Sequence, residues 1–280
     1  MATEGLVIVR GGGDLGTGVA HRLFRAGYAV VVLEREDPRV VRRTVSFAQA
    51  AFDGAASVEG VETRKATVAE AAAAVSGPGR PDWVPLVIDP EGASIEALRP
   101  GAVVDARMAK RNLGTVRGDA PVTIGLGPGF RAGEDVDYVV ETMRGHSLGR
   151  LIDEGSAAPD TGVPAEVRGV GRERVIRSPG VGQFRSVRAI GDLVGDGELV
   201  GTVGEAEARA GVSGLLRGLV ADGTRLRGGD KLGDVDPRGS EIDHMLISDK
   251  ARAVAGAVLE GLLRGRALPR CPTTVRNSDV

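Results

Sequence analysis

The feature that most constrains the fold is an alternation of apolar runs with a glycine-rich turn in residues 6–34. A short apolar run over residues 6–10 leads into five glycines within residues 11–18. Residues 19–26 carry apolar side chains at helical spacing, and residues 28–33 form a second apolar run. Buried parallel strands are nearly continuous apolar runs, and a helix that joins two of them makes a right-handed crossover. The segment therefore predicts an α/β fold with a parallel sheet.

The rest of the first half repeats this alternation. Further strands are predicted at residues 84–88, 102–104 and 122–126, and helices at residues 67–75 and 135–143. We therefore expect residues 1–150 to form a Rossmann-like, doubly wound parallel sheet that binds a ligand. Such sheets place their ligands at the carboxyl ends of the strands.

A different, mainly-β architecture is expected after residue 150. Residues 151–177 contain many glycines and prolines and predict a linker or long loop. Within residues 178–240, short β-runs alternate with glycine turns, and residues 178–203 align without a gap on residues 210–235. Two such copies resemble the halves of lipoyl and biotinyl carrier domains, which form a barrel-sandwich hybrid. The connection between the copies has no lysine to carry a prosthetic arm, so a docking or dimerisation domain is expected.

The last segment, residues 241–280, combines a helix with a polar tail. Ser248 precedes apolar residues at helical spacing up to about residue 264, so it is expected to cap the helix. The one cysteine of the chain, Cys271, lies in the tail, which excludes an internal disulfide and a metal cluster bound by cysteines.

Charge and hydropathy exclude several classes of protein. The 36 Lys and Arg residues and 38 Asp and Glu residues give a net charge of −2, so no overall field attracts nucleic acid or an anionic membrane. No apolar run reaches the roughly 18 residues of a membrane span, and the first residues do not resemble a signal peptide. A cytoplasmic protein is expected, and a homo-oligomer is left open.

The glycine turn has the spacing of a phosphate-binding loop. Gly11, Gly13 and Gly16 match G-x-G-x-x-G between a predicted strand and a predicted helix. The first glycine permits a tight turn, the second lets the backbone approach a phosphate, and the helix N-terminus supplies free N–H groups. Glu34, at the end of the second strand, is placed to bind a ribose 2′-hydroxyl. The alternative is a tight turn that binds nothing, because Asp14 would repel a phosphate unless it caps the helix.

A cationic segment follows the second strand. Residues 37–44 begin like a helix capped by Asp37 and carry Arg39, Arg42 and Arg43. These arginines are candidates for binding a phosphate or the acidic face of a partner, and the alternative is a solvated basic surface.

A second polar cluster is predicted where two later strands end. Its members are Asp105, Arg107, Lys110 and Asn112 after one strand, and Gly127 and Gly129 in the turn after the next. The turn glycines are candidates for an anion-binding nest, so both segments are expected to share an anion site. The alternative is a charged loop beside an ordinary turn.

Catalysis is not indicated at any position. His146 is the best functional candidate among the three histidines, while His21 and His244 are expected to be structural or exposed. None of them has the spacing of a metal site.

Eight stretches of the chain resemble the YqeB family. They are residues 10–18, 42–47, 105–115, 125–130, 141–150, 190–201, 233–239 and 247–253. The family motif D-A-R-M-A-K-R-N-L-G-T is intact at residues 105–115. Gly12 and Gly16 stand where the family motif R-G-A-G-D-L-A-T-G has alanines, and both changes still admit a backbone turn.

The YqeB resemblance implies an accessory protein of selenium-dependent molybdenum hydroxylases, with the hydroxylase apoenzyme as partner and a role related to that of the XdhC chaperones. We therefore predict a maturation protein that binds a phosphate-bearing ligand, either molybdopterin or a dinucleotide such as NAD(P) or another adenine nucleotide. The alternatives are an NAD(P)-dependent oxidoreductase and a nucleotide-sensing regulator. The candidate binding residues are Gly11, Gly13, Asp14, Gly16, Thr17, Glu34, Arg42, Arg43, Asp105, Arg107, Lys110, Asn112, Gly127, Gly129 and His146.

Overall fold

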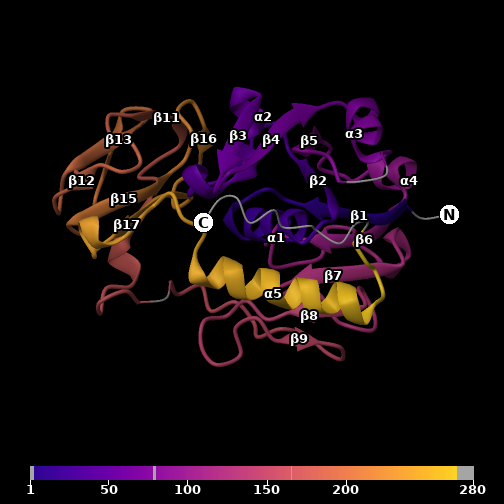
Figure 1. Cartoon of the computed structure of the whole chain (residues 1–280). Helices are drawn as coiled ribbons and strands as arrows, with labels where there is room; N and C mark the ends of the chain where they lie inside the picture. The colour runs from indigo at the N-terminus through magenta and orange to yellow at the C-terminus, as the bar shows by residue number, and fades with distance from the viewer. Residues whose placement is uncertain (1–2, 78–79, 165, 270–280) are drawn as a thin grey trace.

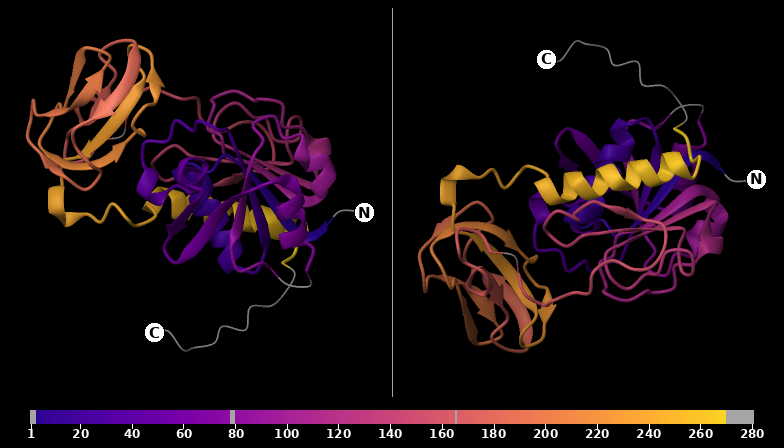
Figure 2. Two further views of the ribbon diagram at one scale, coloured as in Figure 1. Left: turned by 90° about the horizontal axis from the view of Figure 1, so that it is seen from above. Right: turned by 90° about the horizontal axis from the view of Figure 1, so that it is seen from below.

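The chain folds into two parts, a large α/β unit and a smaller β domain (Figures 1 and 2). The computed structural model describes residues 3–77, 80–164 and 166–269. The first half of the chain builds most of the α/β unit, and the chain returns to that unit through a long helix after it has formed the β domain (Figure 2).

A nine-stranded mixed sheet forms the centre of the α/β unit, in the order β3-β4-β5-β2-β1-β6-β7-β8-β9. The strands are β1 (Thr3–Arg10), β2 (Ala29–Glu34), β3 (Ala55–Val58), β4 (Val61–Ala66), β5 (Val84–Ile88), β6 (Pro100–Asp105), β7 (Val122–Leu126), β8 (Tyr138–Val140) and β9 (Leu151–Ile152). The strands from β4 to β8 in this order run parallel, and the edge strands β3 and β9 pair antiparallel with their neighbours.

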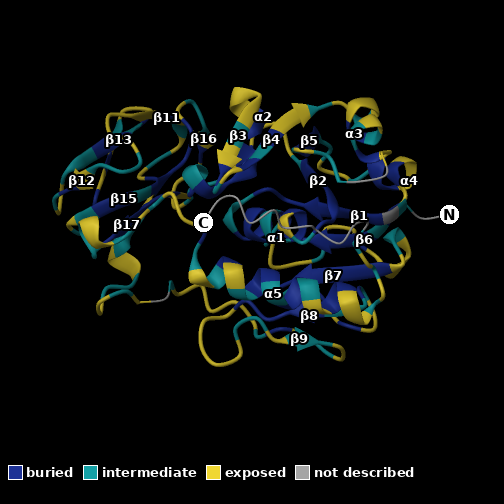
Figure 3. Ribbon diagram, in the orientation of Figure 1, coloured by how far each residue is buried: buried dark blue, intermediate teal, exposed yellow. Residues whose placement is uncertain are grey.

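Helices cover both faces of this sheet and bury it (Figure 3). The helices are α1 (Asp14–Arg25), α2 (Ala50–Asp53), α3 (Val68–Val75), α4 (Ser94–Leu98) and α5 (Asp249–Arg264). Val7 and Val9 belong to the core formed with α1, α2 and α5, whereas Leu6 and Ile8 belong to the core formed with α3 and α4. This alternation follows from the two-residue period of a strand. No helix in the described ranges is long and apolar enough to cross a membrane.

The predicted fold class, a Rossmann-like doubly wound parallel sheet followed by a barrel-sandwich-like domain, is wrong. The sheet is mixed, and the connections β6–β7 and β7–β8 form no α-helix in the described structure. A doubly wound sheet takes its covering helices from the crossovers. Here α5 returns from the end of the chain to cover β7 to β9 and to pack on α1 (Figure 1). Gly18 permits this close packing, because a Cβ at Gly18 would lie 2.8 Å from the Cβ of Ala251.

The predicted helices have mixed outcomes. The helices expected at residues 67–75 and from residue 248 are observed as α3 and α5, with Thr67 and Ser248 as their N-caps. The helix expected at residues 135–143 is wrong, because this segment contains β8, which pairs with β7.

The segment of residues 37–42 is not the start of a helix but the junction between the two parts. The N–H of Leu219 in the β domain donates to the carbonyl of Val41 over 2.8 Å. Arg43 Nε donates to the carbonyl of Leu219 over 2.8 Å, and Arg39 pairs with Asp230 at 3.3 Å. These tertiary contacts override the local helix signal.

The β domain consists of two four-stranded antiparallel sheets, β10-β17-β15-β12 and β14-β13-β11-β16, rather than the expected barrel-sandwich layout. The strands are β10 (Val175–Arg177), β11 (Gly182–Ser186), β12 (Leu193–Val194), β13 (Leu199–Val203), β14 (Ala206–Arg209), β15 (Gly214–Leu219), β16 (Arg225–Leu226) and β17 (Lys231–Asp236). β12 pairs with β15 and β16 pairs with β11, so the aligned copies at residues 178–203 and 210–235 each contribute one strand to the sheet of the other. Phe184, Leu216 and Leu232 pack between the sheets.

Candidate functional site

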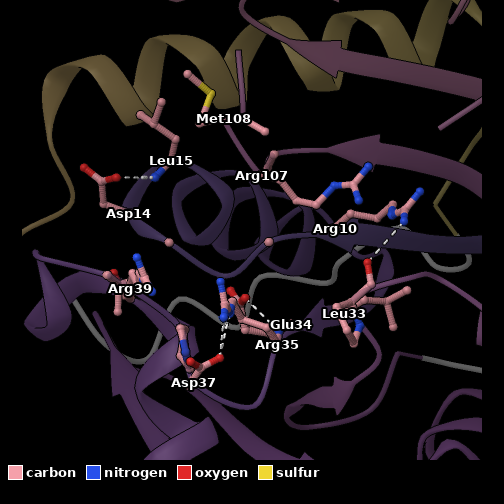
Figure 4. Close-up of a pocket in the computed structure, with 18 of the residues that line it drawn as sticks. Arg10, Asp14, Leu15, Leu33, Glu34, Arg35, Asp37, Arg39, Arg107 and Met108 are labelled. Carbon is pink, nitrogen blue, oxygen red and sulfur yellow. Dashed lines mark hydrogen bonds and ion pairs between the residues drawn. The ribbon is translucent and has the colours of Figure 1, made fainter. Parts of the chain in front are cut away.

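A pocket of about 990 Å³ lies at the carboxyl ends of β1, β2, β5 and β6. The β domain contributes Lys231 to its lining. Its charged lining residues are Arg10, Asp14, Glu34, Arg35, Glu36, Asp37, Arg39, Arg42, Asp89, Glu91, Arg107 and Lys231 (Figure 4). Open α/β sheets place their ligands at this edge, so the pocket is the candidate site.

The glycine turn between β1 and α1 forms the floor of the pocket. Gly11 has φ +100°, and a Cβ there would lie 3.1 Å from the carbonyl oxygen of Ala106. Gly13 is the N-cap residue of α1 and lines the pocket, and its Cβ would meet only Val40, at 3.6 Å. Gly16 lies outside the pocket, where a side chain would overlap the carbonyl of Gly11. Gly13 is thus the glycine that leaves room for a ligand.

Two arginines lie side by side at one end of this turn (Figure 4). Arg10 is the last residue of β1 and is 2% exposed. Its Nη1 donates to Thr115 Oγ1 over 2.8 Å, and Nη2 of Arg107 donates to the same oxygen over 3.3 Å. Arg107 also pairs with the buried Asp105 at 2.5 Å. Two guanidinium groups therefore converge on one hydroxyl.

Arg10 is incompletely satisfied in this position. Its Nη2 donates to the carbonyl of Glu91 over 2.8 Å, so the groups that it contacts directly are uncharged oxygens. Its Nε is buried and has no hydrogen-bond partner in the described part of the chain. Burial lowers the pKa of Arg10, and the positive charge of Arg107 lowers it further. An anion at this end of the pocket would offset both effects.

Asp14 and Arg39 lie on the other side of the turn (Figure 4), and Arg42 pairs with Asp14. Arg42 is 8% exposed, and its Nη1 lies 3.4 Å from Oδ2 of Asp14. Asp14 Oδ1 accepts a hydrogen bond of 3.0 Å from the N–H of Leu15. Burial lowers the pKa of Arg42, and the charge of Arg217 in the β domain lowers it further. The Asp14 carboxylate therefore accepts a hydrogen bond from the first turn of α1 and pairs with Arg42, so its negative charge is partly offset.

Glu34 lies at the position predicted for a ribose-binding acid, but its carboxylate accepts a hydrogen bond from the backbone of the glycine turn. Its Oε2 accepts a hydrogen bond of 2.8 Å from the N–H of Gly12, and its Oε1 accepts one of 2.8 Å from the N–H of Arg35. Burial raises the pKa of Glu34 in spite of these bonds. Both oxygens of the carboxylate are engaged by the protein.

Several predicted site residues support the pocket without lining it. Thr17 is buried, donates to the carbonyl of Gly12 and accepts from the N–H of Phe47. Asn112 Nδ2 donates to the carbonyl of Thr115 over 2.8 Å and so shapes the loop beneath Arg10. Asp105 forms an ion pair with Arg107 and fixes the position of its guanidinium group.

Other predicted residues lie away from the pocket. Lys110 pairs with Asp160 at 2.6 Å, and Arg43 is committed to the domain junction. His146 is an exposed residue of the turn before β9. Gly127 and Gly129 pack the turn after β7 against its neighbours. The expected anion site shared by residues 105–115 and this turn is not formed as one cavity, since Arg107 faces the pocket and the turn glycines do not.

Arg10 and Lys231 are two of the pocket residues that sequence reasoning missed. Arg10 gave a signal, because an arginine at the end of an otherwise apolar strand must find partners or a ligand when it is buried. Lys231 is one of only four lysines in the chain, but its approach to the pocket depends on how the β domain packs. In the described residues, no group of three or more His, Cys, Asp or Glu side chains is arranged to hold a metal ion.

Comparisons with known proteins give little information on fold class. No family model matches the chain. An aspartoacylase family protein from Mesorhizobium loti is 14% identical, with 82% of this chain and 84% of that one covered and a TM-score of 0.27. The ectoine utilization protein EutE (DoeB) from Ruegeria pomeroyi is 17% identical, with 84% and 85% covered and a TM-score of 0.25. These TM-scores are too low to carry an argument about fold or activity.

One relative is far more similar in sequence. The uncharacterized protein YqeB of Escherichia coli (strain K12) is 49% identical over 258 residues, which are 92% of this chain and 47% of that protein. The chain spans about half the length of this relative. The match supports the assignment to the YqeB family.

The expected functional description is corrected at the same time. The mixed nine-stranded sheet overturns its Rossmann-like and barrel-sandwich terms. The relative is uncharacterized, so it does not support the predicted role in molybdenum hydroxylase maturation, and that role is not carried further.

Proposed function

We propose that this chain binds a small molecule through a phosphate group held between the Gly11–Gly13 turn and the guanidinium groups of Arg10 and Arg107. The observation that carries the proposal is the convergence of Arg10 and Arg107 on Thr115 Oγ1 while the buried Nε of Arg10 has no partner in the described structure. Asp105 pairs with Arg107, whereas Arg10 donates only to uncharged oxygens, so an anion beside Arg10 is favoured.

The backbone supports the same assignment. Gly13 leaves open space at the N-terminus of α1, where the helix dipole favours an anion. Arginine forms bidentate hydrogen bonds with phosphate, which suits the paired guanidinium groups. Carboxylate-bearing ligands share part of this chemistry and are distinguished by the test.

The test is titration calorimetry of the purified chain with methyl phosphate, inorganic pyrophosphate and acetate. Saturable phosphate binding that weakens with added salt is expected. Gly13→Val should reduce the affinity at least about tenfold, because its side chain fills the space of the phosphate, while the melting temperature changes little. Gly118→Val is the matched control, since Gly118 is exposed, lies outside the pocket and has nothing within 4 Å of its Cβ position.

Two results would overturn the proposal. One is the absence of saturable phosphate binding by the wild type, and the other is an unchanged affinity in Gly13→Val. Binding of acetate without phosphate would replace phosphate by a carboxylate as the recognised group.

A further inference from the structure

The pocket contains a second group of cations. Arg39, Arg42 and Lys231 line it, and Arg39 lies across the turn from Arg10 and Arg107 (Figure 4). Arg39 pairs at 3.3 Å with Asp230, the residue that precedes Lys231, so the backbone at Lys231 lies near Arg39. The two cation groups therefore belong to opposite sides of one cavity.

Arg42 is as poorly satisfied as Arg10. Its Nη1 and Nη2 contacts, to Asp14 and to the carbonyl of Leu246, are both long, at 3.4 Å. Its Nε is buried and has no partner in the ranges that the structure describes. A buried donor without a partner is costly unless a ligand completes it.

The cations of the second group differ in how they are paired. Asp14 and Asp230 offset Arg42 and Arg39. Lys231 is exposed and makes no ion pair with any described residue. The neighbouring Asp37 pairs with Arg35 at 2.6 Å, so it is not free to neutralise Lys231. Lys231 is therefore the cation of this group that has no carboxylate partner in the described structure.

The size of the pocket agrees with two binding groups. A cavity of about 990 Å³ is at the upper end of the range for whole organic ligands and far exceeds the needs of one phosphate. Apolar wall residues, Leu33, Val40 and Met108, lie among the charged groups.

We infer that the ligand carries a second anionic group, which Arg42 and Lys231 bind on the opposite side of the pocket, so that the ligand bridges the α/β unit and the β domain. This inference rests on the proposed phosphate site. It assigns the ligand to the class of small molecules with two separated anionic groups and an organic body between them. It also gives the β domain a direct role in binding.

The test compares methyl phosphate with a series of α,ω-alkanediol bisphosphates from two to eight carbons. For at least one chain length, the wild type should bind the bisphosphate about tenfold or more tightly than methyl phosphate. Lys231→Met should remove most of this gain and leave the affinity for methyl phosphate unchanged. Lys110→Met is the matched control, because Lys110 pairs with Asp160 outside the pocket, and it should keep the gain.

The outcomes separate the inference from the proposed function. If methyl phosphate binds but no bisphosphate binds more tightly, the second site is wrong and the first stands. If the gain is present and Lys231→Met retains it, Lys231 is not part of the second site. If neither probe binds, the proposed function itself fails.

Discussion

Two glycine-rich turns leave the carboxyl edge of the nine-stranded sheet, and they differ in what surrounds them. The turn after β1 contains Gly13, which faces the pocket and has only Val40 near its Cβ position, at 3.6 Å. The turn after β7 contains Gly127 and Gly129, both with positive φ. A Cβ at Gly129 would lie 2.5 Å from the backbone nitrogen of Arg111, and one at Gly127 would lie 2.6 Å from Thr142 Oγ1.

The comparison shows that glycine can serve either a ligand or the packing of the chain. At Gly13 the missing side chain leaves an open space at a helix N-terminus that lines the pocket. At Gly129 the missing side chain admits another loop of the same protein. The first turn is therefore expected to respond to substitution in binding, and the second in stability.

The largest effect is expected from Gly129→Ala. Alanine at φ +110° is strained, and its Cβ would lie 2.5 Å from the backbone nitrogen of Arg111. We expect the free energy of unfolding to fall by about 3 kcal/mol, measured by urea denaturation. The affinity of the remaining folded protein for methyl phosphate should stay unchanged. A fully stable Gly129→Ala variant would show that the two turns are not distinguished by packing.

The sequence was informative where local patterns and tertiary structure agree. The apolar runs of β1 and β2 and the capped helices α3 and α5 are recognisable because their side-chain period and end residues act within a few positions. It was misleading where contacts between segments far apart in the chain determine the local structure. Residues 37–42 pair with Leu219, and α5 takes the place of crossover helices after β6 and β7. A single sequence carries no direct signal of either contact.

The residues of the candidate site show the same difference between local patterns and long-range contacts. Gly11, Gly13 and Arg107 were found from local motifs, and all three line the pocket. Glu34 had the right place in sequence, but both of its oxygens accept backbone N–H groups. Lys231 reaches the pocket only through the packing of the β domain, so no motif near it could predict its role.

A smaller, pH-dependent effect is expected at Glu34, which holds the first turn. Because burial raises its pKa above the ordinary 4.5, the folded state binds a proton more readily than the unfolded state. This contribution to stability is fully present below pH 4.5 and is lost as the pH rises through the folded pKa. Relative to Glu34→Gln, the wild type should therefore gain stability as the pH falls from 7 to 4.5, in urea denaturation at several pH values.

Glu70 provides the control of opposite sign. Hydrogen bonds from Thr67 in the capping box of α3 lower the pKa of Glu70. Its contribution is present above the unfolded pKa and is lost as the pH falls through the folded pKa. Relative to Glu70→Gln, the wild type should keep its stability from pH 7 to 4.5 and lose it as the pH falls further through the folded pKa. If the Glu34 and Glu70 variants change in the same direction, burial is not what sets the pKa of Glu34.

The smallest effect is expected from Lys110→Met beside the second turn. Lys110 has φ +61°, and its side chain is 61% exposed where it pairs with Asp160. The pairing lowers the pKa of Asp160. Exposed ion pairs contribute little to stability, and methionine retains most of the apolar stem, so the unfolding curve should overlay that of the wild type at neutral pH. The affinity for methyl phosphate should also stay unchanged, because Lys110 does not line the pocket. A loss of phosphate affinity in Lys110→Met would join the two turns into one anion site, as the sequence alone predicted, and would remove the distinction between them.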